Sequence, residues 1–183
     1  LRVLDLHGLG VRCLPSSIGK LIHLRYLNLS ETEIKALPNS ITKLQNLQTL
    51  ELSRCWSLSR LPADIFKKLT NLRSLSLDDV WAPSFSLPSG LGQLTSLHKL
   101  TYLRVCMDKL GKEKTATLSD LKNLNNLRGS LRILLWSAIS DPLHEAKEAN
   151  LGSKRGLKEL DIDWWQKHGS ENSEALLEGL KPH

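Results

Sequence analysis

The sequence predicts an α/β solenoid, with one curved parallel β-sheet on the concave side and short helices and turns on the convex side. Three observations support this prediction. An LxxLxL phrase occurs four times, beginning at residues 1, 24, 47 and 72. Each copy continues to a Leu-Pro pair and then closes with an apolar residue and LxxL. The four copies are 23, 23, 25 and 25 residues long, so the chain consists of tandem units rather than unrelated segments.

A period of 20–29 residues with this opening is the signature of a leucine-rich repeat. In the strand of the second repeat, Leu27 and Leu29 point to one face, whereas Tyr26, Asn28 and Ser30 point to the other. One repeat cannot bury its own leucines, so neighbouring repeats must cover them. We therefore expect a single sheet whose buried residues include Leu4, Leu6, Leu27, Leu29, Leu50, Leu52, Leu75 and Leu77.

The proline of each Leu-Pro pair marks the point where the chain has left the sheet. Proline has no N–H to donate, so it breaks no ladder hydrogen bond outside the sheet. We expect turns that lead to the convex side at Pro15, Pro38, Pro62 and Pro88.

After residue 96 the repeat pattern becomes irregular. The sequence still predicts strands at 97–106, 127–136 and 157–165, a polar loop from 107, and helices within 142–156 and 170–183. The helix within 142–156 should turn Ala146 and Leu151 inward and end near a glycine. We interpret residues 1–183 as one leucine-rich-repeat domain, with regular repeats at 1–96 and irregular repeats at 97–183. The abrupt start without a polar cap predicts a fragment of a longer chain.

Composition argues against several classes of function. The formal net charge of +6 comes with no Lys/Arg-rich run, so a nucleic-acid interface is not expected. No apolar run approaches the roughly 20 residues of a membrane-spanning helix. The odd, widely spaced cysteines Cys13, Cys55 and Cys106 argue against disulfides and predict a reduced, intracellular setting, with Cys55 in the core.

No catalytic or metal-binding arrangement is visible in the sequence. The six histidines form no HxxxH or HExxH pair. Asp161 and Asp163 share the outward face of one strand, where two carboxylates are expected to be ordinary surface. Residues 110–117 resemble a phosphate-binding loop, but Cys106 occupies the place of the first glycine and Glu113 follows Lys112. We therefore predict that the chain is not an enzyme and binds no cofactor or metal.

Two passages resemble a known family. The phrase LSRCWSLSRLP (52–62) resembles the LxxCxxLxxLP phrase of plant leucine-rich-repeat resistance proteins. The segments LSDLKNLNNLRGSLRI, EAKEANLGSKRGLKELDIDW and LLEGLKPH resemble the repeat domains of plant nucleotide-binding, coiled-coil-type (NBS-LRR) disease-resistance proteins. The resemblance implies an intracellular, cytoplasmic immune receptor. Its nucleotide-binding module, outside these residues, would exchange ADP for ATP, while the repeats would recognise pathogen effectors or a guarded host protein and keep the receptor off.

Two other classes of protein use similar repeats. Ras-binding signalling scaffolds share the Leu-Pro-x-x-Ile phrase and 23-residue repeats, but they usually keep a uniform repeat length. Plant extracellular receptor ectodomains favour a Gly-x-Ile-Pro phrase and capping cysteine pairs, which are missing here. The Ras-binding type stays open as the alternative interpretation.

Two sets of residues are candidates for contacts with protein partners. The first set should lie on the outward face of the concave sheet, in rows ~4.8 Å apart: Tyr26, Asn28, Glu51, Ser76 and Asp78. The second set occupies the second position of each repeat and should form a basic column along the sheet edge, which could dock on the nucleotide-binding module: Arg2, Arg25 and Arg73, with Gln48 interrupting and Lys158 following.

Overall fold

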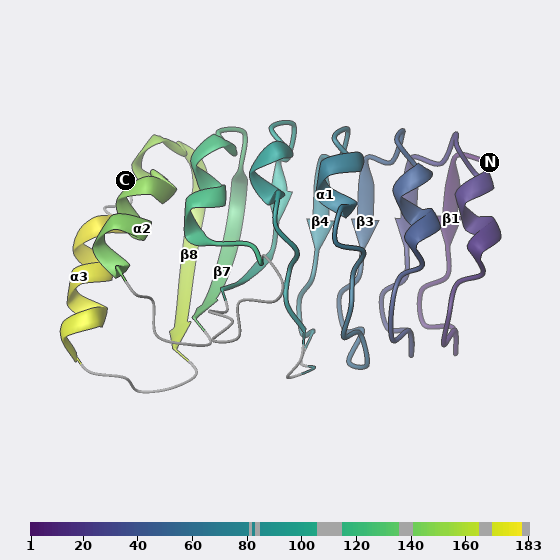
Figure 1. Cartoon of the computed structure of the whole chain (residues 1–183), viewed down its shortest axis with the longest axis horizontal. Helices are drawn as coiled ribbons and strands as arrows, with labels where there is room; N and C mark the ends of the chain where they lie inside the picture. Colours follow the sequence, from purple (N-terminus) through teal and green to yellow (C-terminus); the bar gives the residue numbers. More distant parts are fainter. Residues whose placement is uncertain (81, 83–84, 106–114, 136–140, 165–169, 181–183) are drawn as a thin grey trace.

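The computed structural model describes residues 1–80, 82, 85–105, 115–135, 141–164 and 170–180. The elements follow one another along a single axis from the N-terminal to the C-terminal end. Strands form one layer and short helices form the other, as Figure 1 shows. This two-layer arrangement is the predicted solenoid.

The regular repeats place their strands in one parallel sheet. Its order is β1-β2-β3-β4-β5, and the strands are β1 (Val3–Asp5), β2 (Tyr26–Asn28), β3 (Thr49–Glu51), β4 (Ser74–Ser76) and β5 (Lys99–Leu100). The register aligns Leu4, Leu27, Leu50 and Leu75 in one inward row. The prediction that the four LxxLxL segments share a sheet is confirmed.

The irregular repeats form a second parallel sheet, so the prediction of one sheet for the whole chain is wrong. This sheet has the order β6-β7-β8, with β6 (Tyr102–Val105), β7 (Arg128–Leu135) and β8 (Gly156–Trp164). The strand expected at 97–106 is divided between the two sheets. The break lies at Thr101, the residue between β5 and β6.

The hydroxyl of Thr101 explains this break. In earlier repeats the equivalent ladder bond joins two backbone groups, as where Leu52 N donates to Ser76 O at 2.9 Å. Leu77 N instead donates to Thr101 Oγ1 at 2.9 Å. The carbonyl oxygen of Thr101 is then available to accept from Arg132 N at 3.0 Å. The side chain of Thr101 therefore takes the last hydrogen bond of the first sheet, and its carbonyl takes the first bond to β7 in the second sheet.

Burial follows the prediction except at the first repeat. Leu27, Leu29, Leu50, Leu52, Leu75 and Leu77 have no exposed surface. Leu4 and Leu6 are only half-buried, so the prediction is wrong for these two residues. β1 is an edge strand, and none of the described residues forms a strand on its outer side.

Helices of three to eleven residues form the convex layer. Their order along the chain is η1 (Ser16–Lys20), η2 (Asn39–Lys43), α1 (Ile65–Lys68), η3 (Leu91–Gln93), η4 (Leu118–Asn123), α2 (Pro142–Ala149), η5 (Leu151–Ser153) and α3 (Ser170–Leu180). Pro15 and Pro38 precede η1 and η2 in extended conformations, as expected of residues outside the sheet. η1 and η2 approach closely, because a Cβ at Gly19 would lie 2.7 Å from Ser40 O.

The predicted helices of the second half are present. Ala146 and Leu151 are 1% and 3% exposed, as expected for inward side chains. α2 ends at Asn150 in the left-handed conformation (φ 49°) rather than at a glycine. α3 packs on α2, where a Cβ at Gly179 would lie 2.7 Å from Ala146 Cβ. Most of the expected polar loop and of the segment 110–117 falls outside the described residues.

Candidate interaction surface

The concave side carries a shallow groove, which we call the concave groove. Four of the five residues predicted for this face line it, namely Tyr26, Asn28, Glu51 and Asp78. The groove continues over the strand ends to His7, Ser30, Glu31, Ser53, Arg54 and Asp79, and Lys99 of β5 also lines it. The parallel register places Asn28 directly beside Glu51. The sequence therefore predicted the central part of this surface.

Ser76 is the exception and is not a contact residue. Its side chain is 1% exposed, although Ser76 continues the row of Asn28 and Glu51. The pairing of β4 with β5 ends at Leu75 and Leu100, so Ser76 lies just beyond it, where the first sheet ends and the chain passes to Tyr102. A short side chain at this junction lies below the surface, so the prediction for Ser76 is wrong.

A row of charged residues borders the concave groove at the left-handed turn that follows each early strand. Glu31, Arg54 and Asp79 have φ values of 59°, 58° and 57°, and the equivalent residue of the first repeat is Gly8 at 68°. A non-glycine residue in this region costs roughly 1–2 kcal/mol. Strained residues of this kind are concentrated at functional sites. We did not predict this row, although its spacing is visible in the sequence once Gly8 is aligned with the three charged residues.

These charged residues form ion pairs with one another across repeats. Arg54 Nη1 lies 2.9 Å from Glu31 Oε1, and Arg54 Nε lies 3.7 Å from Asp79 Oδ2. The three side chains remain partly exposed, so each pair contributes about 0–1 kcal/mol to stability. Their main effect is to fix the positions of charged groups along the rim of the groove.

Tyr26 supplies an aromatic ring to the lining of the concave groove. The residue is half-buried. Burial raises the pKa of Tyr26, and the carboxylates of Asp5 and Glu51 raise it further. The phenol therefore stays protonated at neutral pH and can both donate and accept hydrogen bonds.

The basic column predicted along the sheet edge is present in the early repeats. Arg25 N donates to Arg2 O at 2.8 Å, and Gln48 N donates to Arg25 O at 2.8 Å. Arg73 N then donates to Gln48 O, also at 2.8 Å. All three arginines are exposed. Within the described part of the chain, no carboxylate lies within ion-pair distance of Arg2, Arg25 or Arg73.

The late part of the column differs from the prediction. Leu157 pairs with Gly129 and Glu159 pairs with Ser130, so a register shift leaves Lys158 outside the column. Arg128 continues the column instead, because its N donates to His98 O at 2.9 Å. Arg128 was not predicted, although Leu127-Arg128 repeats the dipeptide found at Leu1-Arg2. We call Arg2, Arg25, Arg73 and Arg128 the arginine column.

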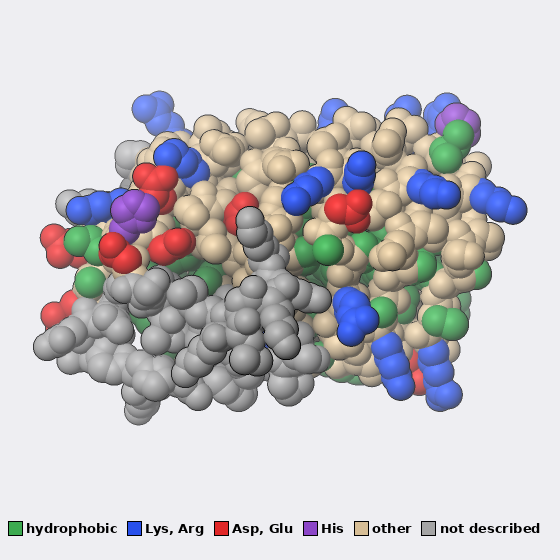
Figure 2. Space-filling model, viewed as in Figure 1, with side chains coloured by type: hydrophobic (Ala, Val, Ile, Leu, Met, Phe, Trp, Pro, Cys, Tyr) green, Lys and Arg blue, Asp and Glu red, His purple; other side chains and the backbone are tan. Residues whose placement is uncertain are grey.

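The helix-bearing face has a different distribution of charge. Figure 2 shows Lys and Arg side chains spread over its N-terminal half, whereas acidic side chains gather toward the C-terminal end. Among the described residues, no group of three or more His, Cys, Asp and Glu side chains is placed to hold a metal ion. None of the described helices is both long and apolar enough to cross a membrane.

Comparisons with known proteins agree with this architecture. A family model described as a leucine-rich repeat region matches residues 1–182. The whole chain is 44% identical to the putative disease resistance protein RGA1 of Solanum bulbocastanum and spans 18% of its length. A second relative, the disease resistance protein RGA2 of the same species, is 42% identical over 95 residues, which are 50% of this chain and 9% of that protein.

A solved structure supports the fold alone. A leucine-rich-repeat protein of Leptospira interrogans aligns with 96% of this chain and 46% of its own, with a TM-score of 0.62 and 22% identity. Together with the family match, these relationships show that the chain belongs to the leucine-rich-repeat family and is a repeat region of the kind found in plant disease-resistance proteins.

Proposed function

We propose that this chain is the recognition and restraint region of a cytoplasmic plant immune receptor. The observation that carries the proposal is the concave groove, which gathers Tyr26, Asn28, Glu51 and Asp78 on one accessible surface. The relationship to disease-resistance proteins favours this function over a Ras-binding scaffold. We assign the binding of ADP and its exchange for ATP to a nucleotide-binding module outside these residues, and the chain itself acts by binding proteins.

The concave groove is suited to a pathogen effector or a guarded host protein. Tyr26, Asn28 and Glu51 project from strands whose backbone groups are already paired in a ladder, so their positions are set before a partner arrives. Tyrosine and arginine are enriched among the residues that dominate protein–protein binding, and Tyr26 and Arg54 both line the groove. The polar residues between them determine which partner fits.

Exchange of the groove residues is the direct test of recognition. In the receptor that carries this region, the combined change of Tyr26, Asn28, Glu51 and Asp78 to alanine should abolish the effector-dependent response, because the few central residues that dominate an interface each cost about 2 kcal/mol or more when truncated. The measurement is cell death in leaves after co-expression with the effector, together with receptor abundance. In the control variant, Gln45 and Thr95, which are exposed outside the groove, are changed to alanine. A full response from the groove variant at normal abundance would exclude the groove.

We further propose that the arginine column docks on the receptor's own nucleotide-binding module and helps to hold the off state. Like charges aligned along one edge repel, although a Debye length of about 8 Å weakens the repulsion between exposed groups. An acidic partner surface would offset that repulsion. The competing explanation is that each arginine covers neighbouring apolar surface with its stem.

Charge reversal distinguishes these two explanations. Changing Arg2, Arg25 and Arg73 together to glutamate should release the off state and give signalling without effector, because each contact with an acidic surface becomes a repulsion. Changing the same residues to methionine keeps the apolar stem and should give a weaker release. The measurements are effector-independent cell death and co-precipitation of the separately expressed module. Silent glutamate variants that accumulate normally and still bind the module would disprove docking.

A further inference from the structure

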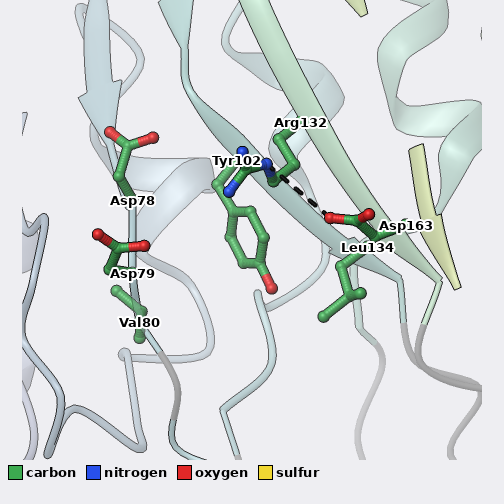
Figure 3. A pocket seen from close by; sticks show the side chains of 7 residues that line it. All are labelled: Asp78, Asp79, Val80, Tyr102, Arg132, Leu134 and Asp163. Carbon is green, nitrogen blue, oxygen red and sulfur yellow. Dashed lines mark ion pairs between the residues drawn. The ribbon is translucent and has the colours of Figure 1, made fainter. Parts of the chain in front are cut away.

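A pocket opens on the concave face where the two sheets meet, and we call it the junction pocket. Residues 78–80, which follow β4, form one side of the pocket, and Tyr102 of β6 lies between this side and the opposite one. Arg132 and Leu134 of β7 and Asp163 of β8 form the other side, as Figure 3 shows. The pocket depends on the break at Thr101, because the register after the break pairs Tyr102 with Arg132.

The charge of the junction pocket favours a cation. Arg132 Nε lies 2.8 Å from Asp161 Oδ2 and 3.9 Å from Asp163 Oδ2, so neighbours in its own sheet already neutralise this guanidinium. Asp79 is paired with Arg54, and Asp78 Oδ2 accepts a hydrogen bond from Ser53 at 3.1 Å. Counting the lining residues and their ion-pair partners, the carboxylates of Asp78, Asp79, Asp161 and Asp163 face the guanidiniums of Arg54 and Arg132. The buried guanidinium of Arg104, beside Leu134 in the register, donates to Ala82 O at 2.8 Å, and with it the carboxylates still outnumber the guanidiniums by one. An anionic ligand would meet this excess of negative charge and would have to compete with Asp161 for Arg132.

The uncharged lining favours a cation on an apolar stem. Val80, Leu134 and Tyr102 are 2%, 8% and 9% exposed, and they present apolar surface between the carboxylates. In Figure 3 the ring of Tyr102 lies between Asp79 on one side and Leu134 on the other. Lysine and arginine place a charged end in polar surroundings and cover apolar surface with their stems. Their charged ends also bind favourably over the face of an aromatic ring.

The remaining concave face has the same sign of charge. Asp5 lies on β1, Glu51 on β3 and Glu31 at the rim, and these three carboxylates outnumber the two basic side chains of the concave groove, Arg54 and Lys99. The concave side is therefore more acidic than the chain as a whole, whose formal net charge is +6. We infer that the junction pocket receives a lysine or arginine side chain from a protein partner whose contacting surface is basic. This inference rests on the proposed recognition function and specifies the chemistry of its partner.

The test uses small probes that carry one side chain each. Nα-acetyl-arginine methylamide is titrated into the isotope-labelled 183-residue chain at low salt, and backbone chemical shifts are followed by NMR. The matched probe is the citrulline analogue, which keeps the shape of arginine but has no charge. We expect saturable shifts at residues 78–80, 102, 132–134 and 163. The citrulline analogue should bind at least about fivefold more weakly than the arginine probe, as the loss of about 1 kcal/mol predicts.

Variants locate the binding to the pocket. The double variant Asp79→Asn and Asp163→Asn should weaken the arginine probe by about fivefold or more. Asparagine tolerates the left-handed conformation of Asp79, so the fold is expected to persist, and circular dichroism checks this. The control variant Glu33→Gln and Asp64→Asn removes the same charge from positions outside the pocket and should leave the affinity unchanged.

Three results would overturn the inference: equal binding of citrulline and arginine, stronger binding of Nα-acetyl-glutamate methylamide, or equal weakening by the control variant. The outcome is separable from that of the proposed function. If the arginine probe binds as expected but the groove substitutions leave effector recognition intact, the proposed function fails while the pocket remains a cation site. If groove substitutions abolish recognition but the pocket does not prefer arginine, only this inference fails.

Discussion

The substitution Leu50→Ala is expected to lower the free energy of unfolding by about 2–5 kcal/mol, the range for removing a large buried side chain from a core. Leu50 has no exposed surface and lies in β3, between Leu27 of β2 and Leu75 of β4. The cavity would therefore be enclosed by two neighbouring repeats, which cannot close it without moving the sheet. Urea unfolding of the 183-residue chain, followed by circular dichroism, measures the loss.

Leu4→Ala is the matched control, because it removes the same atoms from the same position of the first repeat. Leu4 is half-buried in the edge strand β1, so its removal exposes less new cavity surface. We expect a clearly smaller loss of stability than for Leu50→Ala. Equal losses for the two variants would show that the inward leucine row does not carry the core in the way that the structure indicates.

The inward rows could be predicted because they depend on one simple property. The position of Leu50 follows from a two-residue strand period and the recurring LxxLxL phrase, and both are visible in the letters alone. The concave positions of Asn28 and Glu51 follow from the same alternation. Stacking of Arg2, Arg25 and Arg73 also follows, because each of them occupies the second position of the LxxLxL phrase that enters the sheet.

The break between the sheets could not be predicted in this way. Threonine is well suited to a strand, and nothing in the sequence shows that the hydroxyl of Thr101 replaces a backbone acceptor for Leu77 N. The buried Ser76 and the junction pocket both lie at this break, so they could not be predicted either. The register shift that displaces Lys158 is likewise a property of pairing with β7 rather than of its own segment.

Asparagines on the connections between helices and strands were also missed, although they recur at equivalent positions. Asn46 Nδ2 donates to Ile22 O at 2.8 Å, and Asn71 Nδ2 donates to Gln45 O at 2.8 Å. Asn126 makes the equivalent bond to Thr95 O at 2.9 Å. Each bond joins one repeat to the preceding one and satisfies a carbonyl that has left the ladder. A polar residue in a loop gives no sign of such a partner until the repeats are stacked.

The buried lysine of the last repeats breaks the leucine pattern and leads to the second large effect. Lys154 follows η5 as its C-cap. In the earlier repeats leucine occupies this C-cap position: Leu21, Leu44, Leu69, Leu94 and Leu124. Lys154 is 2% exposed, and its Nζ has no hydrogen-bond partner among the described residues. Burial lowers the pKa of Lys154 from its ordinary value of 10.5, because the charged form loses its hydration.

We therefore expect Lys154→Leu to raise the free energy of unfolding at pH 7 by about 1–3 kcal/mol, since it replaces an unpaired buried polar group by the side chain that other repeats use. Lys147→Leu on the exposed side of α2 is the control and should change stability by less than about 0.5 kcal/mol. Both are measured by urea unfolding of the full chain.

The pH dependence of the gain identifies its cause. Because the folded-state pKa of Lys154 lies below the unfolded value, the unfolded chain binds more protons between these two pKa values, and the stability contributed by this residue rises with pH through that window. The advantage of Lys154→Leu should thus be largest below the folded pKa and shrink as the pH approaches 10.5. Burial raises the pKa of Tyr26 and Cys55, and these groups have the opposite effect. They are present in both proteins and cancel in the difference. A gain that stays constant up to this pH would mean that leucine stabilises by packing alone and that the buried ammonium carries no penalty.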